Sequence, residues 1–78
     1  MIIINKHRTQ IFNIDNFAYI TKMDDLRIPS HRKYGIVGRY NGSENYTDIE
    51  SYDNEKERDE DFDSIIAYLA QEERVVRL

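Results

Sequence analysis

The chain has 78 residues and a mass of 9.4 kDa, with 40% hydrophobic residues, 33% charged residues and a net charge of −4. This length predicts one small domain over 1–78 and leaves no room for separate cofactor and substrate domains. Because cysteine is absent, disulfides and thiolate metal sites are excluded. No apolar run approaches ~18 residues, and Met1 to Ile4 is too short for a signal peptide, so we expect a cytoplasmic protein without a membrane partner.

The amino-terminal part of the chain, 1–52, is predicted to form the strands of a sheet. Ile2-Ile3-Ile4 is a β-branched run that is apolar on both faces, which suits a central strand. Alternating residues over 9–14 indicate a second strand, and a third follows over 17–23 after the turn signal Asp15-Asn16.

The next stretch, 24–33, contains the only proline and is expected to be an exposed loop. A fourth strand is predicted over 34–40 and a fifth over 45–52, joined at the hairpin signal Asn41-Gly42.

Two registers are open for the last two strands. A two-residue loop pairs Val37 with Tyr46, whereas a four-residue loop pairs Ile36 with Ile49. Both registers place the same four side chains on the face that we assign to the core: Tyr34, Ile36, Thr47 and Ile49.

A helix is predicted over 54–73. Asn54 and Glu57 match a capping box, in which Asn is the N-cap and Glu follows three residues later. An apolar stripe at helical spacing should face the sheet: Phe62, Ile65, Ile66 and Leu69. We expect this stripe to pack against Phe12, Ile14, Tyr34, Ile36 and Ile49. The tail, 74–78, can extend the helix, add an edge strand or form a dimer contact.

These elements predict an α+β fold, a twisted antiparallel sheet of four to five strands with one C-terminal helix packed on one face. Gly35 and Gly38 lie inside a strand, where glycine indicates a bulge or a close approach rather than a phosphate loop. His7 and His31 lack the spacing of a metal site, and no nucleophile motif is present. The sequence therefore predicts neither an enzyme nor a bound cofactor or metal.

Charge points to two alternative binding surfaces. Residues 1–40 carry a net charge of +4 and residues 41–78 a net charge of −8. The first surface is the acidic patch, which would attract a basic surface of another protein: Glu55, Glu57, Asp59, Glu60, Asp61 and Asp63. The alternative is the basic and aromatic segment 27–40, which could bind single-stranded nucleic acid: Arg27, Arg32, Lys33, Tyr34, Arg39 and Tyr40.

Two short motifs in this sequence resemble those of a group of known proteins. Asn13 to Phe17 after a hairpin, and Tyr52 to Arg58 opening a C-terminal helix, resemble a loose pattern in short proteins of bacteriophages and Gram-positive bacteria. The resemblance implies a small antiparallel sheet followed by one helix and supplies no catalytic residues. It also implies a phage or mobile-element accessory protein that works in the host cytoplasm.

We therefore expect a non-enzymatic protein that binds another macromolecule through the acidic patch. Inhibition of a host defence nuclease, in the manner of an anti-CRISPR protein, is the specific version of this hypothesis. The alternatives are a module that binds single-stranded nucleic acid through 27–40 and a structural protein that forms a homodimer or a larger homo-oligomer.

Overall fold

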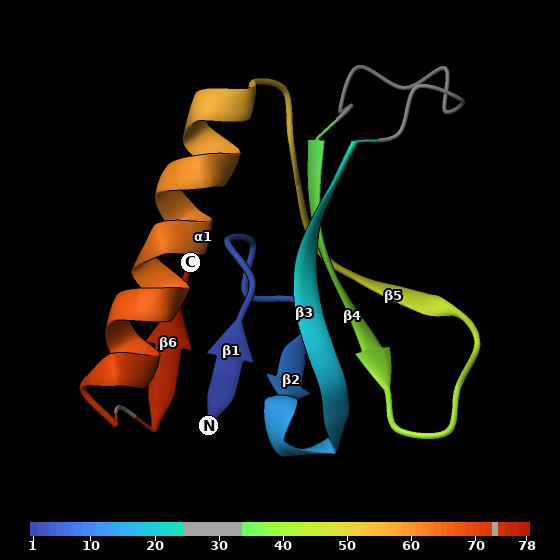
Figure 1. Ribbon diagram of the computed structural model, residues 1–78. Helices are drawn as coiled ribbons and strands as arrows, with labels where there is room; N and C mark the ends of the chain where they lie inside the picture. Colours follow the sequence, from blue (N-terminus) through green and yellow to red (C-terminus); the bar gives the residue numbers. More distant parts are fainter. Residues whose placement is uncertain (25–33, 73) are drawn as a thin grey trace.

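The computed structural model describes residues 1–24, 34–72 and 74–78. Figure 1 shows the elements in chain order: β1 (Ile2–Ile4), β2 (Ile11–Asn13), the 3-10 turn η1 (Ile14–Asn16), β3 (Phe17–Asp24), β4 (Tyr34–Tyr40), β5 (Tyr46–Tyr52), α1 (Glu55–Ala70) and β6 (Val75–Arg77). The predicted α+β class is confirmed. The predicted loop lies, apart from Asp24, outside the described residues.

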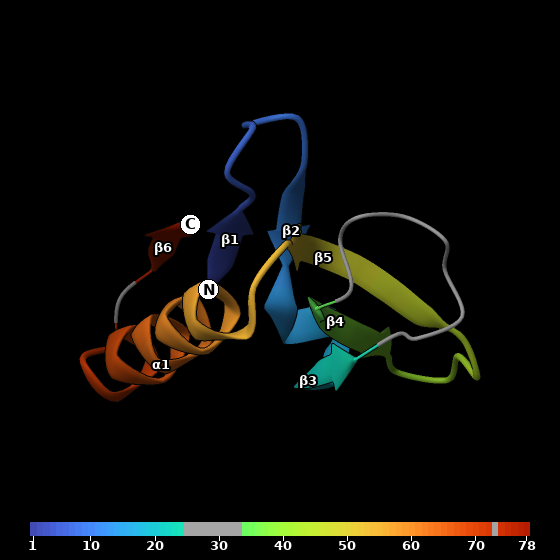
Figure 2. The ribbon, with the colours of Figure 1, turned by 90° about the horizontal axis from the view of Figure 1, so that it is seen from above.

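Among the described residues, the strands form two three-stranded sheets, in the orders β2-β1-β6 and β3-β4-β5. The prediction of a single antiparallel sheet of four to five strands was therefore wrong. Seen from above in Figure 2, β6 and β1 lie to one side of β3, β4 and β5, and β2 lies between β1 and β5. The chain passes from one sheet to the other at η1, because β2 and β3 do not pair with each other. The tail forms β6, which pairs parallel with β1, so that Ile3 lies opposite Val76.

The β3-β4-β5 sheet is antiparallel throughout, and one pair predicted between β4 and β5 is wrong because the register is irregular there. Arg39 lies opposite Tyr46, as the four-residue loop requires, and Gly42 adopts the positive φ of 82° that the turn needs. A register shift then places Ile36 opposite Glu50 rather than Ile49. As a result both Ile49 and Glu50 are buried.

Gly38 is a place where two parts of the chain approach closely. A Cβ atom at this position would lie 2.9 Å from the ring of Phe17, too near for any side chain. Phe17 packs over the glycine and is itself buried. One of the two predictions for this glycine, a close approach, is therefore confirmed, and the approaching group is the ring of Phe17.

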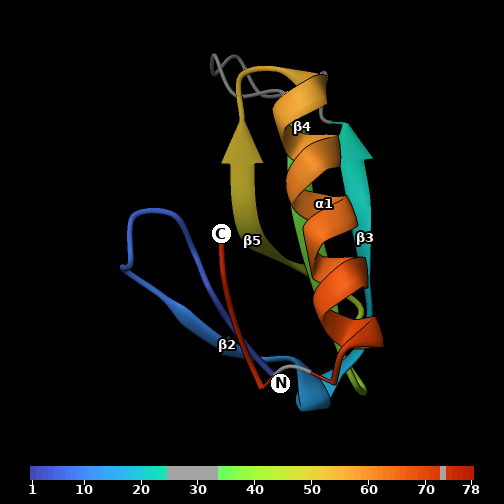
Figure 3. The same cartoon turned by 90° about the vertical axis from the view of Figure 1, so that its left-hand side faces the viewer.

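One core joins the two sheets and the helix. Its buried side chains come from the helix and from each of the described strands, with Phe17 as the contribution of β3. They are Ile3, Phe12, Phe17, Ile36, Ile49, Tyr52, Ile65 and Val76. Figure 3 shows α1 lying along the face of the β3-β4-β5 sheet, in front of β4. The helix therefore covers the middle of this sheet and leaves the flank beside β3 open.

The predicted apolar stripe of the helix is only half buried. Ile65 is 2% exposed and Phe62 packs against the core, but Ile66 is 53% exposed and Leu69 is 48% exposed. The prediction that Ile66 and Leu69 pack in the core was wrong. The sheet below the helix has three strands rather than five, and it is too narrow to cover the whole stripe.

The helix begins where the cap predicts. The Oδ1 atom of Asn54 accepts a hydrogen bond of 2.7 Å from the backbone N–H of Glu57. The side chain of Glu57 does not complete the capping box, because it pairs with Lys6. The helix ends at Ala70 rather than at residue 73, and Glu72, with a φ of 57°, turns the chain toward β6. None of the described residues forms a helix long and apolar enough to cross a membrane.

Replacing the cap should measurably weaken the fold. We expect Asn54→Ala to lower the free energy of unfolding by about 0.5–2 kcal/mol, because one N–H of the first turn loses its acceptor. Urea denaturation followed by circular dichroism measures this change. Asp53→Ala, at the exposed preceding residue, is the matched control. Equal unfolding midpoints for the two variants would contradict the role of the cap.

Candidate functional site

The six residues of the predicted acidic patch surround the first turns of α1 instead of forming one surface. Five of them lie within 4.0 Å of basic side chains from other parts of the protein or from the helix itself. Glu57 and Asp61 face Lys6 of the β1–β2 connection, whereas Asp59 faces Lys22 of β3. The structure therefore divides these carboxylates between two flanks and the outer side of the helix.

On the β1 side, a small polar cluster holds the helix. The Lys6 ammonium contacts Glu57 and lies 3.2 Å from Asp61, while the hydroxyl of Tyr52 donates a 2.7 Å hydrogen bond to Asp61. Burial opposes the charged form of Lys6, but its hydrogen bonds to the two carboxylates outweigh burial and raise its pKa. Burial, followed by the hydrogen bond to Asp61, raises the pKa of Tyr52. These carboxylates stabilise the fold and are partly neutralised.

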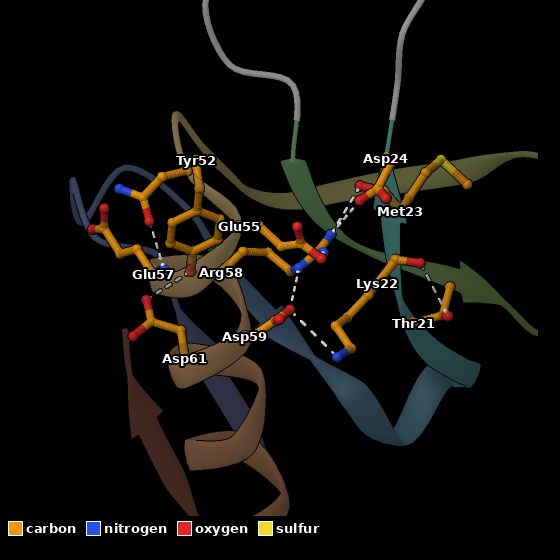
Figure 4. A network of polar contacts seen from close by, with 11 residues as sticks. Thr21, Lys22, Met23, Asp24, Tyr52, Glu55, Glu57, Arg58, Asp59 and Asp61 are labelled. Atoms are coloured by element: carbon orange, nitrogen blue, oxygen red, sulfur yellow. Dashed lines mark hydrogen bonds and ion pairs between the residues drawn. The ribbon is translucent and has the colours of Figure 1, made fainter.

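On the β3 side, Arg58 forms the centre of a second network, shown in Figure 4. Its guanidinium, from a side chain only 4% exposed, donates hydrogen bonds of 2.7 Å to Asp24 and to Asp59. Asp59 also lies 3.3 Å from the Lys22 ammonium. The hydrogen bond from Arg58 is the main cause that lowers the pKa of Asp59. Sequence patterns gave no sign of this buried arginine, because its position falls among the helix's charged residues.

The remaining members of the predicted patch are more exposed. Glu55 lies 3.7 Å from Arg58, and Glu60, 66% exposed, lies 4.0 Å from Lys56. Asp63 is exposed on the outer side of the helix, three residues before Ile66. Exposed pairs at these distances contribute little to stability. Glu60 and Asp63 are therefore the members of the patch best placed to meet a partner.

The predicted nucleic-acid segment is not a single surface in its described part. Arg27, Arg32 and Lys33 lie outside the described residues. Tyr34 packs 5.4 Å from the guanidinium of Arg58, and the ring of Tyr40 lies 4.4 Å from that of Phe17. Arg39 points to the opposite face of the sheet, because side chains alternate along a strand.

Sequence reasoning missed an aromatic row on that opposite face. Tyr19, Arg39 and Tyr46 lie opposite one another on β3, β4 and β5. The two tyrosines are 42% and 47% exposed, and their hydroxyls are 3.1 Å apart. Hydrogen bonds with Tyr46 and then with Arg39 lower the pKa of Tyr19. Only the strand register brings these residues together.

A polar hollow of about 230 Å³ lies beside the β1–β2 connection, and Glu50 lies at its base. Glu50 is 7% exposed, yet both its carboxylate oxygens accept backbone hydrogen bonds, from Lys6 at 2.8 Å and from Ser51 at 3.0 Å. A buried carboxylate satisfied in this way serves the fold. Within the described ranges, no cluster of three or more His, Asp or Glu side chains is arranged to hold a metal ion.

An apolar concave surface, the α1–β3 groove, is a hollow of about 260 Å³ between the helix and β3. Its lining is made almost entirely of aliphatic and aromatic side chains: Ile14, Phe17, Tyr19, Ile20, Phe62, Ile65, Ile66 and Leu69. Ile66 and Leu69 form its outer wall and remain about half exposed. These are the residues that the sequence placed in the core. The helical spacing identified an apolar stripe, but only the width of the sheet decides which part stays open.

The chain was compared with protein-family models, with curated proteins and with solved structures, and none of them matches it. The resemblance to short phage and Gram-positive proteins is therefore still a prediction.

Proposed function

We propose that this chain is a non-enzymatic binding protein that engages another protein through the α1–β3 groove. The observation that carries the proposal is the exposure of Ile66 and Leu69 beside a concave apolar surface. Contiguous apolar surface on a small domain commonly marks an interaction site. Covering it with a partner gains about 25 cal/mol for each Å² of apolar surface removed from water.

The charge of the chain supports a basic partner. The net charge is −4, and the outer side of the helix presents Glu60 and Asp63, of which Asp63 lies one turn before Ile66. Opposite charge steers two proteins together and disfavours acidic partners. In this proposal the apolar groove supplies most of the affinity, and the exposed carboxylates supply orientation and rate of encounter.

A more specific role follows from the same charge. A phage or mobile-element accessory protein that blocks a host nuclease would meet a basic, nucleic-acid-binding surface, which suits exposed helix carboxylates. A host defence nuclease is therefore the class of partner that we propose to test first, with inhibition of the nuclease as the function. The paired carboxylates Glu57, Asp59 and Asp61 contribute less to it, because basic side chains of the protein already contact them.

Binding of single-stranded nucleic acid is a second candidate, favoured by the Tyr19–Arg39–Tyr46 row. Exposed aromatic rings on a sheet can stack bases, and a neighbouring arginine can contact phosphate. The acidic net charge of the chain opposes this function. We therefore rank it below protein binding.

The test compares two variants of one helix. The tagged wild-type chain and the variants Ile66→Ser and Tyr68→Ser are used to capture proteins from host lysate treated with nuclease. Tyr68 is 39% exposed and lies outside the groove, so Tyr68→Ser is the matched control. We expect a partner that the wild type and Tyr68→Ser retain and that Ile66→Ser loses at least about tenfold, which corresponds to about 1.4 kcal/mol.

Three outcomes would contradict the proposal. Equal capture by all three chains would show that the groove is not the binding surface. Loss of the captured protein only on reversal of Glu60 and Asp63 to Lys would assign binding to the exposed carboxylates alone. Retention of an oligonucleotide that depends on Tyr19 and Tyr46 would favour the nucleic-acid function instead.

A further inference from the structure

We propose that the partner binds as an added β-strand along the open edge of β3, with its apolar side chains in the α1–β3 groove. This inference rests on the proposed function and specifies the form of its partner. The occupant is an extended segment of another protein that carries apolar residues at alternate positions and a net positive charge.

The first observation is the position of β3 in its sheet. β3 is an outer strand, paired with β4 on one side, and no other described strand pairs with its second side. β3 is eight residues long, and it is longer than the other described edge strands, β2, β5 and β6. An edge of this kind presents a row of backbone N–H and C=O groups to an incoming chain.

The second observation is that the groove lies beside the same edge. Ile20 of β3 lines one side of the hollow, and Ile66 and Leu69 of α1 line the other. Figure 3 shows the helix running alongside β3, above its sheet. A strand added about 4.8 Å outside β3 would lie below the exposed flank of the helix. Every second side chain would then point toward Ile66 and Leu69.

The third observation concerns charge and decides between a foreign segment and a second copy. Two copies paired through β3 would bring together two chains of net charge −4, with the exposed Asp63 of each helix near the shared interface. A basic segment would meet the same carboxylates with attraction. Lys22, near the end of β3, is held by Asp59 and so opposes a basic segment only weakly.

The groove's limits define the segment that it accepts. At one end Lys22, paired with Asp59, lies over the ring of Phe62, and at the other the groove reaches Ile14 and Phe17. The apolar side chains that face the helix should therefore number two or three, since they recur every second residue along a strand. Residues on the other face of the added strand would point to the side that carries Tyr19 and Tyr46, which is open to water.

The experiment uses a synthetic probe with the same number of residues as β3, in which valine and lysine alternate. Its affinity for the full chain is measured by fluorescence anisotropy. A second peptide has the same side chains but N-methyl groups on alternate backbone amides, which removes the hydrogen-bond donors. We expect N-methylation to weaken binding at least about tenfold, because several backbone hydrogen bonds are lost. Ile66→Ser should weaken binding of the unmodified peptide, whereas Tyr68→Ser should not.

The outcomes separate this inference from the proposed function. Binding that depends on Ile66 but is unaffected by N-methylation would overturn strand addition and leave the groove as the binding surface. If the probe did not bind, the inference that the partner is a basic, extended segment would be wrong. The lysate capture would still decide whether the groove binds a protein. A concentration-dependent dimer, seen by sedimentation and lost in Ile66→Ser, would show that a second copy fills the groove and would overturn the foreign partner.

Discussion

Ile65→Ala is expected to lower the free energy of unfolding by about 2–5 kcal/mol, the usual cost of removing a buried aliphatic side chain. Ile65 is 2% exposed and lies in the cluster that joins the helix to both sheets. A domain of this length has about 4–12 kcal/mol of stability, so the variant should be largely destabilised or unfolded at room temperature.

The neighbouring residue supplies the control for this prediction. Ile66 is 53% exposed, and Ile66→Ala should change stability by only a few tenths of a kcal/mol, because alanine's higher helix propensity offsets the lost contacts. Urea denaturation of both variants measures the difference. If Ile66→Ala were as destabilising as Ile65→Ala, the helix would be packed on a different face from the one described here.

Val76→Asp is expected to prevent folding. Val76 is 1% exposed in β6, so the change would place a carboxylate among aliphatic side chains without a basic partner, at a cost of about 3–5 kcal/mol. The valine's own apolar burial, worth about 1.5–3 kcal/mol, would also be lost. Together these losses are comparable with the whole stability of a domain of this size.

Val75→Asp tests whether the effect depends on burial rather than on the tail's charge. Val75 precedes Val76 in the same strand, but it is 37% exposed. We expect this variant to keep a folded circular dichroism spectrum and a cooperative melting transition. A folded Val76→Asp protein would mean that β6 does not pack in the core.

Local patterns were sufficient for the elements but not for their assembly. The fourth strand was predicted over 34–40, where the structure has it, and Asn54 was predicted as the N-cap that it is. These features depend on neighbouring residues, so a short window of sequence contains the necessary information. The parallel pairing of β1 with β6 joins the two ends of the chain, and no local pattern indicates such a contact.

The candidate site shows the same limit. The number of carboxylates on the helix can be read from the sequence, but their effective charge depends on Lys6 of the β1–β2 connection and Lys22 of β3, which are distant along the chain. Similarly, the stripe at Ile66 and Leu69 was recognised as apolar from its spacing. Whether such a side chain is core or surface depends on how many strands lie beneath it, a property of the whole sheet.

The parallel pairing of β1 with β6 has a consequence for how the protein acquires its fold. The partners Ile3 and Val76 are separated by nearly the whole chain, and closing so long a loop costs entropy before any contact is gained. During synthesis, β1 lacks this neighbour until residues 75–77 have left the ribosome. Its Ile2–Ile4 run then exposes an apolar, unpaired edge, which is prone to association with other nascent chains. We therefore expect folding to occur after translation of β6 and to compete with aggregation at high rates of expression.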